Sequence, residues 1–250
     1  MGQNTKYPPI LYKYRNWENK FHKQILTKNT LYFASPSNFE DIHDCNLPKK
    51  IPTKDELLEY FTNEAKQEYP QWSRAERREY ARNRAKKSSL RNKGTLSKAL
   101  KKHNEEFNQN IGILSMTTDC NNDEMWHKYA NNHHGLCIGF DTKLLSTSAG
   151  GGGEVKYVHK LPEIDYINED FCTKHIKNIY LKEDKWSFEK EYRLHKWWGN
   201  NATEKDRNIE LPKDCIVKII LGKNMSETAK EEIKAISKDK YPNAEIIENI

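Results

Sequence analysis

The stretch Trp186-Ser187-Phe188-Glu189-Lys190-Glu191-Tyr192-Arg193 places two carboxylates and one guanidinium at alternate positions. Aromatic residues occur between and beside them, which predicts a β-strand. Because successive side chains of a strand point to opposite faces, Glu189, Glu191 and Arg193 are expected to share one face. Neighbouring carboxylates raise each other's pKa and an arginine lowers it, so this row is a candidate for one ionised and one protonatable carboxylate. A solvated edge strand with alternating charges gives the same pattern.

The composition predicts a globular protein with a core of its own. The chain has 250 residues, 36% of them hydrophobic, and its six Trp, thirteen Tyr and eight Phe could also line a ligand pocket. No apolar run reaches the ~20 residues that a membrane span requires, and no signal-peptide core is present. The five cysteines are scattered without metal-binding spacing. We therefore expect reduced thiols and a cytoplasmic protein without a membrane partner.

Hydrophobic periodicity predicts an α+β fold around a mixed, mostly antiparallel sheet. Besides the opening stretch, the expected strands cover residues 11–15, 31–33, 111–116, 136–141, 155–158, 215–221 and 244–247. The expected helices cover residues 54–68, a segment that starts at the capping box of residues 73–76, and residues 125–130, 166–185 and 226–240.

Residues 52–110 differ from the rest of the chain, and we interpret residues 1–250 as a single α+β domain with 52–110 as a helical insertion. Residues 71–102 contain twelve lysines and arginines but two acidic residues, whereas the whole chain has a net charge of +6. Such an excess is typical of a surface that binds phosphate, although a solvated helical face explains it equally well. The candidate nucleic-acid contacts are Arg77, Arg78, Arg82, Arg84, Lys86 and Lys87.

Several motifs occur in an order that resembles a known family. They are Leu11-Tyr12-Lys13-Tyr14-Arg15, the run from Leu31 to Asp41, Met125-Trp126-x-x-Tyr129-Ala130, His134-Gly135-Leu136-Cys137-Ile138-Gly139-Phe140, Trp186-x-x-Glu189-x-Glu191-Tyr192-Arg193 and Ile219-Ile220-Leu221-Gly222. As a set they resemble the bacterial family known as domain of unknown function 2971. The resemblance implies an intracellular α+β protein of a kind suspected of roles in phage defence or toxin systems, with an antitoxin or defence protein as its expected partner.

The order of an early arginine, an aromatic-Ser strand end and a late Glu-x-Glu is similar to the order of active-site parts in ADP-ribosyltransferases. This similarity implies a transferase-like sheet and NAD as substrate, with a nucleic acid or a protein as acceptor. Glu191 would stabilise the ribosyl cation that forms when nicotinamide leaves, and Glu189 would orient or deprotonate the acceptor. The residues expected to bind the cofactor are Arg15, Tyr32, Ser35, Trp126, Tyr129 and Arg193.

Two other classes of function fit the sequence. A metal-dependent nuclease could use Asp41, Asp44, Glu189 and Glu191 with a general-base histidine, and the basic insertion would guide its substrate. A non-enzymatic regulator could bind nucleic acid or protein while the same polar residues form an internal ion-pair network. No metal site is assigned, because two acids and His43 in one loop more often cap turns.

Overall fold

The computed structural model describes residues 7–88 and 93–248, and a seven-stranded sheet forms its centre. The strands are β1 (Ile10–Arg15), β3 (Ile111–Thr117), β4 (Leu136–Asp141), β5 (Gly151–Glu154), β8 (Glu191–Trp197), β10 (Ile216–Leu221) and β11 (Glu245–Glu248). Their order is β11-β10-β4-β1-β3-β8-β5, and the neighbours are antiparallel except for the pair β10 and β11. The predicted α+β class with a mixed, mostly antiparallel sheet is confirmed.

Short strand pairs and helices surround this sheet. The pairs are β2 (Thr30–Tyr32) with β9 (Asn208–Glu210), and β6 (Lys156–Val158) with β7 (Leu181–Glu183). The helices are α1 (Gln24–Thr27), η1 (Pro36–Asn38), α2 (Lys54–Glu68), α3 (Arg74–Lys87), α4 (Lys93–Asn110), α5 (Asp123–Tyr129), α6 (Thr142–Ser146), α7 (Phe171–Tyr180), η3 (Asp184–Glu189), α8 (Glu204–Arg207) and α9 (Glu227–Lys240). Within the described ranges, none of these helices combines the length and apolar character required to cross a membrane.

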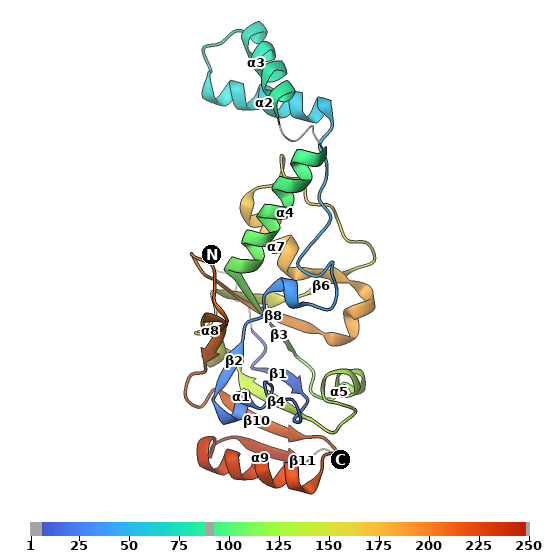
Figure 1. Cartoon of the computed structure of the whole chain (residues 1–250), viewed down its shortest axis with the longest axis vertical. Coiled ribbons are helices and arrows are strands. Elements are labelled where there is room, and N and C mark those ends of the chain that lie inside the picture. Colours follow the sequence, from blue (N-terminus) through green and yellow to red (C-terminus); the bar gives the residue numbers. More distant parts are fainter. Residues whose placement is uncertain (1–6, 89–92, 249–250) are drawn as a thin grey trace.

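The sheet and α9 bury the largest hydrophobic cluster. Leu11, Ile138, Phe140 and Ile219 from three neighbouring strands are no more than 1% exposed, and Ile233 of α9 packs in the same cluster. Helix α9 connects the parallel strands β10 and β11, as a parallel crossover requires. This unit forms one end of the elongated molecule (Figure 1).

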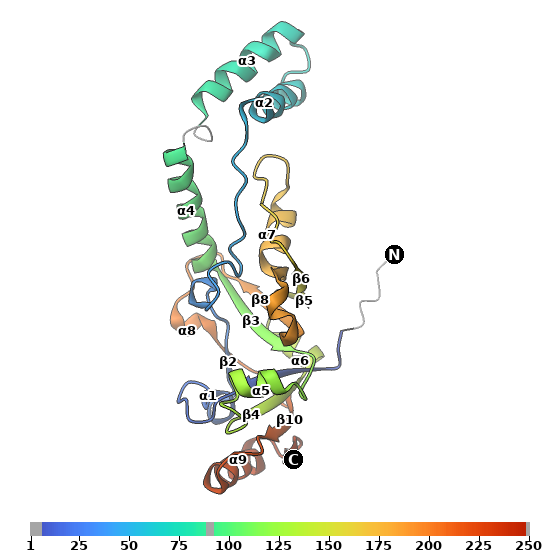
Figure 2. The same ribbon diagram turned by 90° about the vertical axis from the view of Figure 1, so that its right-hand side faces the viewer.

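A helical hairpin of α2 and α3 forms the opposite end of the molecule, beyond the long helix α4 (Figures 1 and 2). Both helices begin with a capping box, in which Thr53 and Ser73 accept from the backbone of the third helical residue. Apolar residues spaced four apart on α2 bury against small residues of α3: Leu57 and Phe61 against Ala81 and Ala85. The interpretation of residues 52–110 as an insertion into one domain stays a prediction. Arg91, one of the twelve basic residues counted in 71–102, lies outside the described residues.

The prediction of one strand through residues 186–193 is wrong. Residues up to Glu189 form the short helix η3, and Lys190 adopts a left-handed conformation with φ 42° before β8 begins at Glu191. The extended backbone is therefore interrupted between the two glutamates. The predicted helix over 166–185 is also too long, because α7 ends at Tyr180 and β7 follows directly.

Gly135, just before β4, approaches the neighbouring backbone closely. A Cβ atom at this position would lie 2.1 Å from the carbonyl oxygen of Arg15. Gly135→Ala should therefore displace the end of β1 and lower the free energy of unfolding by about 1–3 kcal/mol, measured by urea denaturation. The control Gly199→Ala adds a Cβ with nothing within 4 Å and should stay within about 0.5 kcal/mol of the parent protein. Equal stability of the two variants would contradict this expectation.

Candidate active site

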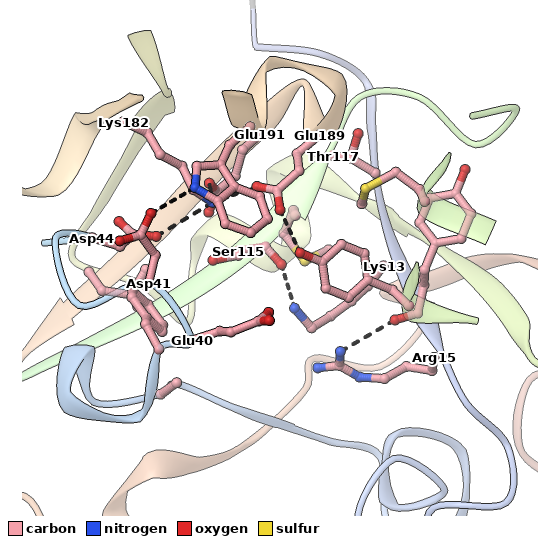
Figure 3. A pocket seen from close by; sticks show the side chains of 18 of the residues that line it. Lys13, Arg15, Glu40, Asp41, Asp44, Ser115, Thr117, Lys182, Glu189 and Glu191 are labelled. Carbon is pink, nitrogen blue, oxygen red and sulfur yellow. Dashed lines mark hydrogen bonds and ion pairs between the residues drawn. The ribbon is translucent and has the colours of Figure 1, made fainter. Parts of the chain in front are cut away.

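The site lies where β1 and β3 separate within the sheet. Strand β1 pairs with β4 along its whole length, but the described ladder between β1 and β3 holds a single residue pair, Tyr12 with Thr117. A cavity of about 430 Å³ is lined by side chains of both strands. Segments 32–44, 125–129 and 182–191 supply most of the remaining lining residues (Figure 3), and His22 supplies one more.

One wall of the cavity consists of carboxylates gathered around Lys182. The Nζ atom of Lys182 lies 2.5 Å from Glu189, 3.1 Å from Glu191 and 3.5 Å from Asp44. The hydroxyl of Tyr129, at the end of α5, donates to Glu189 Oε1 at 2.5 Å. Four separate segments therefore converge on this acidic wall, and the two glutamates reach it despite the break in the backbone between them (Figure 3).

Arg193 lies behind the acidic wall and is 0% exposed. Its Nε and Nη2 atoms donate to the two oxygens of Glu191 at 2.7 and 2.9 Å, and Nη2 also donates to Asp44 at 2.8 Å. Its Nη1 atom donates to the carbonyl oxygen of Ile179 at 2.6 Å. Arg193 does not line the cavity, so its predicted contact with a cofactor has no support in this geometry, and it instead fixes the position of Glu191.

The surrounding cations keep Glu191 ionised. Burial raises the pKa of this carboxyl, but Arg193 and Lys182 together outweigh burial and lower it to about 2. Burial likewise lowers the pKa of Lys182 and Arg193, whereas the adjacent acids raise both above their usual values. Glu191 is therefore a fixed anion at neutral pH, rather than a protonatable group.

The other side of the cavity carries basic groups, namely Lys13 and Arg15 of β1 together with His22. Lys13 donates from Nζ to the carbonyl oxygen of Ser115 in β3, across the split between the two strands (Figure 3). Lys13 was not predicted as a site residue, although its position two before Arg15 on a predicted strand places both on one face. Neither His22 nor Lys182 carries a comparable signal in the sequence.

Three of the predicted cofactor contacts do line the cavity, and they are Arg15, Tyr32 and Tyr129. Four further aromatic residues that were not predicted as cofactor contacts also line the cavity, and they are Tyr12, Tyr14, Phe39 and Trp186. The ammonium group of Lys128 lies 4.1 Å from the ring centre of Trp186, and Trp186 Nε1 donates to Asp41 at 2.7 Å. The cavity thus offers flat apolar surfaces as well as charges of both signs.

The other two predicted contacts lie elsewhere. Trp126 is 1% exposed, with its ring stacked on His133 at 5.2 Å and edge-on to Tyr14 at 5.1 Å. Ser35 is buried and donates to the carbonyl oxygen of Asn108 at 2.8 Å. Both predictions follow from the similarity to ADP-ribosyltransferases, and neither side chain lines the cavity, although the neighbouring residues Ala34 and Met125 do.

The predicted nucleic-acid contacts lie on α3, which is far from α5 (Figure 2), and none of them lines the cavity. Arg77 donates to the carbonyl oxygen of Pro70 at 2.6 Å. The guanidinium of Arg84 lies 5.2 Å from the ring centre of Phe61 and 3.7 Å from Glu64. These two arginines therefore help to hold the hairpin together, whereas the remaining four side chains are exposed: Arg78, Arg82, Lys86 and Lys87.

The acidic residues do not form a metal site of the expected kind. Among residues 7–88 and 93–248, no group of three or more His, Cys, Asp and Glu side chains is arranged to hold a metal ion. Lys182 occupies the position between Asp44, Glu189 and Glu191 that a bound cation would take. Asp41 accepts from the backbone N–H of His43 at 2.9 Å, which is a turn contact.

The family model described as Protein of unknown function (DUF2971) matches residues 125–194. The chain contains a DUF2971 segment, which confirms the predicted family. This segment runs from α5 into β8 and supplies four residues of the acidic wall: Tyr129, Lys182, Glu189 and Glu191. No curated protein and no solved structure matches the chain. The order of motifs that resembles ADP-ribosyltransferases stays a prediction.

The ion pairs of Glu191 make stability depend on pH. Its pKa of about 2 lies below the ordinary value of 4.5, so its ionised form stabilises the fold above pH 4.5, and this contribution is lost as the pH falls toward 2. Glu191→Gln should lower the free energy of unfolding by about 3–5 kcal/mol near neutral pH, because two buried cations lose a partner. Urea denaturation at each pH should show the difference from the parent protein shrinking over this range.

The matched control is Glu210→Gln, which replaces an exposed carboxylate on β9. This variant should differ little from the parent protein at any pH. If Glu191→Gln reduced stability equally at pH 7 and pH 2.5, the carboxylate's charge would not be the stabilising factor.

Proposed function

We propose that the cavity binds NAD, cleaves the bond between nicotinamide and ribose, and transfers the ADP-ribosyl group to an acceptor. The observation that supports this function best is the fixed, ionised carboxylate of Glu191 on the acidic wall, opposite the basic side chains of β1. NAD has a matching polarity, since its nicotinamide ring is cationic and its pyrophosphate is anionic. The aromatic residues that line the cavity provide surfaces on which the nicotinamide ring could stack.

In this mechanism, the bond between ribose C1′ and the nicotinamide nitrogen breaks, and its electron pair leaves with neutral nicotinamide. The ribosyl cation that develops is stabilised by Glu191, whose orientation is fixed in advance by Arg193 and Lys182. An acceptor oxygen or nitrogen then bonds to C1′ and gives up its proton. Glu189, which the hydroxyl of Tyr129 holds in place, orients the acceptor or receives this proton.

The two alternative functions have less support. A nuclease would need a divalent cation at the acidic wall, where Lys182 already makes three ion pairs. A non-enzymatic regulator is consistent with the ion pairs of Arg193, but it gives no role to the large cavity. The setting in a toxin or phage-defence system, with a partner that restrains the activity, stays a prediction from the family resemblance.

Loss of the Glu191 charge should affect the transition state more than substrate binding. We expect Glu191→Gln to reduce kcat for nicotinamide release from NAD by ~10²-fold or more, with a smaller change in KM. Glu189→Gln should affect hydrolysis less than transfer to an acceptor. Labelled NAD with RNA, DNA or protein added separately would identify the product.

Each variant should be assayed at a temperature at which its unfolding curve shows that it is fully folded. The control is Glu210→Gln, which removes an exposed charge. A fully active, folded Glu191→Gln protein would refute the proposed mechanism. Activity of the parent protein in excess chelator would exclude the metal-dependent nuclease.

We further propose that the exposed cations of α3 bind the phosphate backbone of a nucleic acid. Arg78, Arg82 and Lys86 recur every four residues and lie close together on the helix surface, and no ion pair neutralises them within the described part of the chain. A row of this kind can contact successive phosphates without reading bases.

The triple variant Arg78→Gln, Arg82→Gln, Lys86→Gln should weaken binding to an RNA or DNA oligonucleotide. Because fewer counterions are released, the slope of log K against log salt concentration should fall by about 2–3 in magnitude. A matched triple variant at exposed lysines elsewhere, Lys205→Gln, Lys213→Gln, Lys238→Gln, should retain the parent slope. Identical salt slopes for both triple variants, measured by fluorescence anisotropy, would rule out this surface.

A further inference from the structure

Three basic side chains of the cavity lie together without a compensating acid. Lys13 and Arg15 point into the cavity from the same face of β1 (Figure 3). His22 also lines the cavity, close enough for both charges to affect its pKa. In the described residues, neither Lys13 nor Arg15 forms an ion pair, although the acidic wall forms several. The charges of the cavity are therefore separated into an acidic wall, whose three carboxylates share the two cations Lys182 and Arg193, and a basic wall without ion pairs.

The basic wall also has hydrogen-bonding capacity that the protein leaves unused. Arg15 Nε and His22 Nδ1 are buried, and neither has a hydrogen-bond partner in the described chain. Arg15 donates from Nη1 to the carbonyl oxygen of Tyr14 at 3.3 Å, and Lys13 donates to Ser115. Buried polar atoms are rarely left without partners, because each costs about 1–3 kcal/mol, so their presence in a cavity indicates a ligand.

Burial and mutual repulsion act against the charged forms of these groups. Burial, and then Arg15, lowers the pKa of Lys13 well below its usual value. Burial, followed by Arg15 and Lys13, lowers the pKa of His22 to about 4, and burial lowers that of Arg15 to about 10. An anion placed among the three groups would oppose these effects, because it favours each protonated form.

We propose that Lys13, Arg15 and His22 form a binding subsite for the pyrophosphate group of a nucleoside diphosphate. This inference rests on the proposed function in one respect. That function places the rest of the substrate, with its ribose toward Glu189 and Glu191. It adds to that function two residues, Lys13 and His22, and it assigns the pyrophosphate to a defined place.

A phosphoryl group matches the basic wall better than a carboxylate does. Arg15 presents a planar fork of donors, Lys13 a compact ammonium with further donor capacity, and His22 a ring nitrogen without a partner. A pyrophosphate has several acceptor oxygens and more than one negative charge, so it can satisfy all three. The opposite wall would repel a second anionic group, so it selects a substrate whose other end is neutral or cationic.

Binding should also take up protons, because Lys13 and His22 become more basic when the anion arrives. Glu189 and Glu191 on the other wall already raise the pKa of Lys13, although burial outweighs them. Burial raises the pKa of each neighbouring tyrosine, so these groups stay neutral at pH 7 and do not contribute: Tyr12, Tyr14 and Tyr129.

The test is calorimetric titration of the full chain with inorganic pyrophosphate and, separately, with ADP-ribose, in two buffers of different ionisation enthalpy. We expect both ligands to bind with net proton uptake at pH 7. Arg15→Gln and Lys13→Met should each weaken binding tenfold or more, and Lys13→Met should reduce the proton uptake. Lys213→Met, which removes an exposed charge, should leave both quantities unchanged.

The outcomes separate this inference from the proposed function. If pyrophosphate and ADP-ribose fail to bind the parent protein at millimolar concentration, the subsite is refuted, whichever variants fold. It is also refuted if the folded Arg15→Gln and Lys13→Met variants bind like the parent, even when NAD is cleaved. If binding depends on these residues but no nicotinamide is released from NAD, the subsite stands and the proposed transferase function fails.

Discussion

The structure depends on the burial of one guanidinium group. Arg193 is fully removed from water, so its charge must be matched by acids and its donors by acceptors. It draws Glu191 from its own strand, Asp44 from an early loop, and the carbonyl oxygen of Ile179 from α7 into one cluster. Removing one partner of such a cluster typically costs about 3–5 kcal/mol, so strand β8, the loop and the helix are fixed relative to one another.

The same cluster creates the acidic wall of the cavity. Lys182 of β7 joins this cluster, and its ammonium group neutralises part of the negative charge that faces the cavity. The split between β1 and β3 provides the space in front of this wall, because a continuous ladder would fill it with paired backbone. Lys13 spans the split through a hydrogen bond rather than an ion pair, which keeps the two signs of charge on separate walls.

The hairpin of α2 and α3 lies at one end of the elongated molecule, far from α5 (Figure 2), and it supplies no residue to the lining of the cavity. Hairpin contacts within α2 and α3 hold that unit together, with Arg84 covering the ring of Phe61. Our proposals assign the exposed cations of α3 to a large polyanion and the enclosed basic wall to a small phosphorylated molecule.

The sequence alone determined the class of fold and most of its local structure. Periodicity and capping signals located α2, β4 and α9 correctly, because these features depend on neighbouring residues. The order of motifs in the sequence also placed Glu189 and Glu191 in one candidate site with Arg15 and Tyr129. Only the tertiary structure decided that Lys190 breaks the predicted strand and that Trp126 faces the core. Lys182 and His22 joined the cavity for the same reason: long-range packing places them there, and no local pattern encodes such contacts.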